Sequence, residues 1–194
     1  MSKSDPSASK KERNKTIRWV VSIFLITILV SGTISLVSDI IMEASTILVA
    51  FIILLAIVLI GIIFDIIGVA VTSADEKPFH SMAARKVPGA QEAIRLLRQA
   101  ERVSSICNDV VGDICGVVSG SASATIAAQV IASMDFSWPQ VITLLLSALV
   151  AGLTVGGKAI GKTVAIGSCT TIVHTVGKLV WAIRNLPQLL RKKK

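Results

Sequence analysis

Four apolar stretches of this chain are each long enough to cross a lipid bilayer, and they restrict its fold more than any other feature. A helix needs about 20 apolar residues to span the hydrocarbon. Apolar residues make up 53% of the 194 residues and charged residues only 16%. The sequence therefore predicts an all-α membrane protein with four transmembrane helices. The stretches are Trp19 to Val37, Ala44 to about Ser73, Val103 to Met134, and Val141 to about Val155 with an extension towards Ile160.

The positions of lysine and arginine predict how these helices cross the membrane. Six basic residues precede the first stretch, six lie between the second and the third, and eight follow from Lys158 onwards. The other two loops carry only Asp39, Glu43 and Asp135 as charges. Because basic loops stay in the cytoplasm, we expect both termini and the connector at 74–103 to be cytoplasmic. The alternative, a cleaved signal peptide, is disfavoured because its apolar region is usually shorter than this first stretch.

Three regions outside the four apolar stretches differ from them in composition: the start of the chain, the connector and the C-terminal region. The basic, Ser-rich start of the chain predicts a disordered arm. In the connector, Phe79 to Val87 and Ala90 to Val103 fit short amphipathic helices separated by Pro88-Gly89. The C-terminal region repeats this amphipathic pattern, and such helices lie along lipid headgroups. The expected organisation is an arm (1–18), a four-span domain that includes the connector (19–162) and an amphipathic basic helix (163–194).

Several classes of function are excluded by what the sequence lacks. The net charge of +8 comes without aromatic residues interleaved among the basic ones, so we expect contact with anionic lipid headgroups and no nucleic acid. Three cysteines without metal-ligand spacing and two distant histidines, His80 and His174, argue against a zinc site. No nucleophile elbow or phosphate-binding loop is present. We therefore expect no enzyme and no organic cofactor, and a location in a bacterial plasma membrane.

The third stretch combines polar residues with small ones, which most spanning segments do not. Ionisable groups at membrane depth are costly and usually serve a function. Small residues spaced four apart let another helix approach closely, so we expect helix packing there and a homodimer. The small residues are Gly112, Gly116, Gly120 and Ala124 of this stretch, with Gly152 and Gly156 on the fourth.

The polar residues of three stretches fall at one depth. Counted about 20 residues inward from the loops opposite the connector, Asp65, Asn108, Asp109, Asp113 and Lys158 share a level. Asp109 and Asp113 would repel each other unless a cation lies between them, and oxygen ligands suit Mg²⁺. The alternative is that each side chain reaches the interface separately, or that Lys158 pairs with an aspartate.

The order of these elements resembles the transmembrane domain of the cyclin M / CorC magnesium transporters. In that family a span ending in Phe-Ser-x-x-Glu-x-Ala-x-x-Ser leads through two juxtamembrane helices into a span that begins with Gly-Asn-Asn. The family's last span ends in Gly-Glu-x-x-Pro-Lys, and its cytosolic nucleotide-sensing module has no counterpart here. The matching residues are Phe64, Asp65, Gly68, Ala70 and Ser73, then Gly112-Asp113, then Gly157 to Lys162.

The sequence also departs from the family pattern at the positions that matter most. Asp65 stands for a serine, Asp113 for an asparagine and Gly161 for the proline, while Gly68 and Lys158 stand for the two glutamates.

The resemblance implies a homodimer that binds and moves a divalent cation, Mg²⁺, without ATP hydrolysis. Carried over position by position, its ligands are Asp65, Ser73, Asp113 and the backbone of Gly157. The alternative is a membrane scaffold or partner-binding protein that does not transport, with the Lys158 ammonium in the place of the cation.

Overall fold

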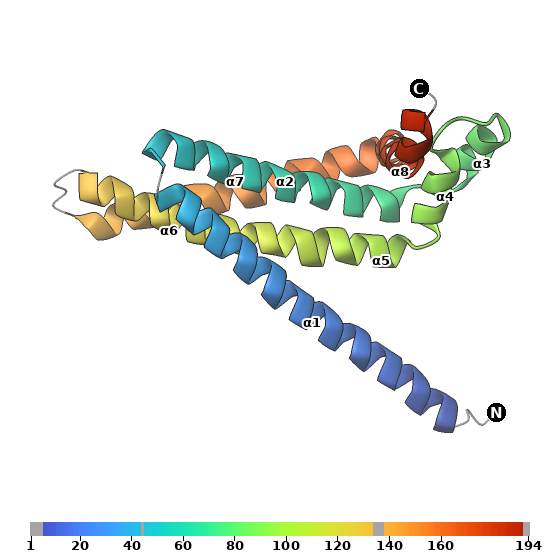
Figure 1. The fold of residues 1–194 in the computed structure, drawn as a ribbon, viewed down its shortest axis with the longest axis horizontal. Helices are drawn as coiled ribbons and strands as arrows, with labels where there is room; N and C mark the ends of the chain where they lie inside the picture. Colours follow the sequence, from blue (N-terminus) through green and yellow to red (C-terminus); the bar gives the residue numbers. More distant parts are fainter. Residues whose placement is uncertain (1–5, 44, 134–137, 192–194) are drawn as a thin grey trace.

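The computed structural model describes residues 6–43, 45–133 and 138–191, and every element in that part of the chain is a helix (Figure 1). Four of the helical segments are long and apolar enough to cross a membrane: Ile17–Met42, Ile47–Ser73, Ala100–Ser133 and Pro139–Gly167. The elements in order are α1 (Pro6–Glu43), α2 (Ile47–Ser73), α3 (Lys77–Ala84), α4 (Ala90–Leu97), α5 (Ala100–Ser105), the π-helix η1 (Ile106–Gly112), α6 (Asp113–Ser133), α7 (Pro139–Gly167) and α8 (Cys169–Arg191).

The outer surface of the long helices is apolar. Leu29, Leu48 and Leu144 are each more than two-thirds exposed, at 68%, 71% and 69%. A water-soluble protein does not expose so many large apolar side chains along whole helices, whereas the hydrocarbon of a bilayer accommodates them. The prediction of an all-α fold with four membrane-spanning helices is therefore confirmed.

Helices α2, α6 and α7 pack along their lengths into a bundle. Glycines allow the close approach: a Cβ added to Gly161 of α7 would lie 2.7 Å from Ile66 Cγ1 on α2, and one on Gly61 would lie 2.8 Å from Cys115 Cβ. Helix contacts through small residues are the usual way in which membrane helices associate. The buried core of the bundle comprises Met42, Ala50, Leu54, Val58, Ala122, Ile126 and Val150.

Helix α1 contacts the bundle through its C-terminal part, where Val30 and Ile34 line a pocket together with residues of α2 and α6. There Ser38 and Met42 are buried, at 8% and 0% exposed. Towards the N-terminus α1 diverges from the other helices (Figure 1), and its apolar residues from Ile17 to Leu29 are exposed except for the half-buried Ile23.

The boundaries of several elements differ from those predicted. Helix α1 begins at Pro6, so the prediction of a disordered arm is wrong for residues 6–18, where the chain simply continues the spanning helix. Helix α7 runs on to Gly167 because Gly161 and Ala165 are buried against its neighbours, and the C-terminal amphipathic helix therefore begins at Cys169 rather than 163. The predicted limits that fall on 1–5, 44, 134–137 and 192–194 lie outside the described residues.

The connector folds into two short helices, as the Pro88-Gly89 break predicted. Gly89 has φ +85°, a backbone conformation that glycine adopts without strain, and α4 starts directly after it. The second predicted helix was expected to reach Val103. Instead α4 ends at Leu97, and the residues from Ala100 onwards already belong to the third span.

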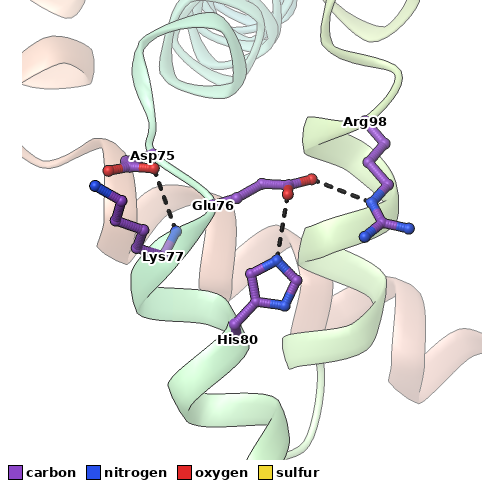
Figure 2. Close-up of polar contacts among 5 residues, drawn as sticks. All are labelled: Asp75, Glu76, Lys77, His80 and Arg98. Atoms are coloured by element: carbon purple, nitrogen blue, oxygen red, sulfur yellow. Dashed lines mark hydrogen bonds and ion pairs between the residues drawn. The ribbon is translucent and has the colours of Figure 1, made fainter.

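A carboxylate at the start of α3 joins the two halves of the connector. Glu76 Oε1 accepts a hydrogen bond from Arg98 Nε at 3.2 Å, and its Oε2 lies 3.3 Å from His80 Nε2 (Figure 2). The neighbouring Asp75 Oδ1 accepts from the backbone N–H of Lys77 at 3.3 Å. Because exposed pairs contribute about 0–1 kcal/mol, these contacts orient the connector more than they stabilise it.

Helix α8 lies across the end of the bundle that carries the connector, which we name the connector end. Figure 1 shows α8 nearly end-on while the long helices run across the view. Gly177 of α8 lies against α4: a Cβ there would be 2.5 Å from the Gly89 carbonyl oxygen and 2.9 Å from the Ala93 nitrogen. Val173 of α8 and Phe79 of α3 are both fully buried in the same cluster. The C-terminal helix is therefore docked on the connector.

Candidate intramembrane polar site

The third span is not a regular α-helix at its polar end. Residues Ile106–Gly112 form a π-helix between α5 and α6. π-Helical turns are rare and occur often at functional sites. This turn contains Asn108 and Asp109, which were predicted as metal ligands, and Gly112, which was predicted as a packing residue.

An aspartate and a lysine face each other beside the π-helix. Lys158 Nζ of α7 lies 3.6 Å from Asp65 Oδ1 of α2, and the two side chains are 27% and 18% exposed. Gly112 of the π-helix lies beside this ion pair. A Cβ added at Gly112 would be 3.4 Å from Lys158 Nζ and 3.8 Å from Asp65 Oδ1. Three spanning helices thus meet at the level predicted, and Lys158 points inward to pair with an aspartate.

Asn108 lies near the pair and has one unpaired oxygen. Its Nδ2 donates to Ser104 Oγ at 3.2 Å, whereas its Oδ1 is buried and accepts no hydrogen bond from the described residues. The side chain packs against Gly68 of α2, where any Cβ would meet Oδ1 first. A buried polar atom without a partner costs about 1–3 kcal/mol, so a water molecule or a cation would be favoured there.

The other predicted metal ligands do not join this contact. Asp109 and Asp113 have exposed side chains. Ser73 is exposed too, and its Oγ donates to the Val69 carbonyl at 2.8 Å. Gly157 packs against Ile62. Over the described residues, no group of three or more His, Cys, Asp or Glu side chains could hold a metal ion. Among the described residues, the three predicted carboxylates are therefore not gathered into one group, and the predicted metal site stays a prediction.

Four of the predicted packing glycines contact no other helix among the described residues. No atom of another helix lies within 4 Å of a Cβ position at Gly116, Gly120, Gly152 or Gly156, and Ala124 is exposed. Of the predicted set, Gly112 alone faces other helices. A helix with 3.6 residues per turn rotates by about 40° for each step of four, so a four-residue repeat does not stay on one face. The buried residues of α6 are Ile114, Val118, Ser119, Ala122, Ser123, Ile126 and Ala127.

A second polar cluster, which was not predicted from the sequence, lies between α1 and α6. Ser121 Oγ donates to Asp39, 3.2 Å from each carboxylate oxygen, and Thr125 Oγ1 lies 3.4 Å from Oδ1. Gln129 Nε2 donates to the Met42 carbonyl at 2.7 Å. Asp39 had been assigned to a loop, but it lies inside α1. The polar residues at 121, 125 and 129, four apart, were the pattern that could have revealed this helix contact.

Comparison of the chain with known protein families, with curated proteins and with solved structures finds no match. The resemblance to the cyclin M / CorC transporters therefore stays a prediction.

Proposed function

We propose that this chain is a membrane scaffold or partner-binding protein in which the Lys158 ammonium takes the place of a bound cation. The observation that carries the proposal is the 3.6 Å contact between Lys158 Nζ and Asp65 Oδ1. An ammonium at this distance neutralises the carboxylate, and it would repel Mg²⁺ from the same oxygens. Magnesium usually binds to proteins through one or two carboxylates and keeps several waters, and here the Asp65 carboxylate already faces an ammonium.

Binding and transport of a divalent cation is the second candidate. It is favoured by the buried Asn108 Oδ1 without a hydrogen-bond donor and by the π-helix that carries this residue. Asp109 and Asp113, exposed on the same span, would supply further oxygens if a second chain or a rearranged Lys158 brought them to the ion. In this candidate Lys158 points away from the bundle interior.

We further propose that two chains associate through the exposed small residues of α6. No described residue of another helix lies against Gly116 or Gly120, Ala124 is exposed, and such residues let the backbones of two membrane helices approach closely. The distribution of basic residues supports a cytoplasmic location for both termini and the connector. The membrane would then be that of a bacterial cell.

A magnesium titration of thermal unfolding separates the two candidates. The purified protein and the variants Lys158→Met, Lys162→Met and Asp113→Ala are melted in detergent at increasing Mg²⁺ concentration. Lys162 is exposed on the same helix, so its variant controls for the loss of one charge. For the scaffold we expect no Mg²⁺ effect on the unmodified protein, and a lower Tm of Lys158→Met that Mg²⁺ restores.

The opposite result would support transport. A bound ion stabilises by about 2.7 kcal/mol at 100 times its Kd, which a melting curve detects easily. Saturable Mg²⁺ stabilisation of the unmodified protein that is lost in Asp113→Ala would contradict the scaffold proposal.

A further inference from the structure

A cavity lies between the connector and α8, beside their contact at the connector end of the bundle. Its volume is about 390 Å³, within the size range of small-molecule sites. The turn between α3 and α4 forms one wall, the first turns of α4 form the floor, and α8 closes the other side. The lining residues that matter here are Lys86, Gln91, Glu92, Arg95, Trp181 and Arg184.

The charges around this cavity favour an anion. Among its described lining residues three are basic and one, Glu92, is acidic. Glu92 is 8% exposed and lies 3.7 Å from Arg95 NH1, so these two charges offset each other. Lys86 and Arg184 are both exposed and form no ion pair with any carboxylate of the described residues. The positive charges of Lys86 and Arg184 are therefore available to bind a ligand.

The first turn of α4, which lines the cavity, has backbone N–H groups that are free to donate hydrogen bonds. Gln91 and Glu92 belong to the first turn of α4, whose N–H groups have no carbonyl acceptor within the helix. The partial positive charge of a helix N-terminus adds to the attraction for a phosphate. Arg184 contributes a guanidinium, which can bind two phosphate oxygens at once.

The position of α8 identifies the source of such an anion. The helix lies across the spanning helices (Figure 1), and its Leu179, Val180 and Ile183 are exposed at 58%, 39% and 71%. A helix in this orientation buries its apolar face at the boundary between headgroups and acyl chains. Trp181, which lines the cavity, is a residue type enriched at that level. The cavity therefore lies beside lipid headgroups.

We infer that this cavity binds the phosphate of an anionic lipid headgroup, such as that of phosphatidylglycerol. Lys86 and Arg184 bind the phosphate oxygens, Trp181 packs against the glycerol portion, and the acyl chains run along the exposed apolar face of α8. A bound headgroup would hold α8 and the connector together from outside, in addition to the Gly89–Gly177 contact.

Native mass spectrometry of the full chain in detergent tests this site. The protein is mixed with phosphatidylglycerol or phosphatidylcholine, and lipid retention is compared for Lys86→Gln, Arg184→Gln, their double variant and Lys178→Gln. Lys178 is exposed on α8 but does not line the cavity, so its variant is a matched control. Basic residues near a bilayer contribute about 1 kcal/mol each, so each cavity variant should bind phosphatidylglycerol about fivefold more weakly and the double variant about 25-fold. Phosphatidylcholine should be retained weakly by every form.

Three results would overturn the inference. Unchanged phosphatidylglycerol retention in the double variant would show that the cavity is not the site. An equal loss in Lys178→Gln would show attraction to the basic surface in general. A thermal shift with inorganic phosphate alone, abolished in the double variant, would assign the cavity to a soluble phosphate instead of a lipid. Lys86 and Arg184 have exposed side chains, so all variants should keep the helical circular dichroism of the unmodified protein.

Discussion

Replacing Lys158 with methionine should destabilise the bundle, and replacing Asp65 as well should restore most of the loss. At 3.6 Å and an effective dielectric constant of about 20, the gross attraction of the two charges is about 5 kcal/mol. Removing one partner of a fully buried pair costs about 3–5 kcal/mol. The side chains here are 27% and 18% exposed, and water screens part of that cost. We therefore expect Lys158→Met to lower the free energy of unfolding by about 2–3 kcal/mol.

The double variant distinguishes a charge effect from a packing effect. In Asp65→Asn with Lys158→Met, neither position carries a charge, and the side-chain volumes stay similar. We expect its stability to lie within about 1 kcal/mol of the unmodified protein, so that adding Asp65→Asn recovers about 2 kcal/mol of the loss in Lys158→Met. Unfolding is followed by tryptophan fluorescence during titration with sodium dodecyl sulfate in mixed micelles.

The matched control is Lys162→Met, one turn further along α7 with an exposed side chain. We expect a change below about 0.5 kcal/mol for this surface substitution. The reasoning is refuted if Lys158→Met and Lys162→Met behave alike, or if the losses of the two single variants simply add in the double variant. Additive losses would mean that Asp65 and Lys158 do not act on each other.

Other regions of the molecule give further predictions. Gly68→Ala should lower the Tm and the free energy of unfolding by about 2 kcal/mol, since its Cβ overlaps an amide side chain of the third span; full stability would contradict this close contact. Gly116→Leu should convert the proposed dimer to monomers on gel filtration in detergent while Val117→Leu does not, and equal behaviour of the two would exclude pairing through the small residues. In a background without native cysteines, Ser133→Cys should react with an impermeant thiol reagent on intact cells and Gln91→Cys only after permeabilisation. The reverse labelling pattern would show that the connector lies outside.

The spans were predictable from the sequence because length and hydropathy alone identify them. The buried faces of the spans were not. Val117 and Val118 are equally apolar neighbours, yet Val117 is 62% exposed and Val118 is 1% exposed. In a soluble helix the exposed position would be polar and would reveal the orientation. In a membrane both faces are apolar, so only the packing of α2, α6 and α7 decides which side is buried.

The candidate site was predictable in its level and not in its contacts. Counting residues from the loops correctly placed Asp65 and Lys158 at one depth, because the rise of a helix per residue is fixed. Which side chains turn toward each other depends on helix rotation. The π-helix at Ile106–Gly112 changes that rotation locally, and no residue pattern in the sequence predicts a π-helix there. Asp109 and Asp113, which were placed at the same depth, have exposed side chains.

The two carboxylates held between spanning helices differ in what they stabilise. Asp65 meets an ammonium and so joins α2 to α7 inside the bundle, whereas Asp39 meets two hydroxyl groups and joins α1 to α6. Hydrogen bonds between membrane helices contribute on average about 0.6 kcal/mol each, so the polar contacts of Asp39 and Gln129 hold α1 weakly. No residue in the most apolar 18-residue window of the first span is fully buried. The first span is therefore the element that can separate while α2, α6, α7 and the docked α8 stay packed, and local opening follows the contacts that stabilise least.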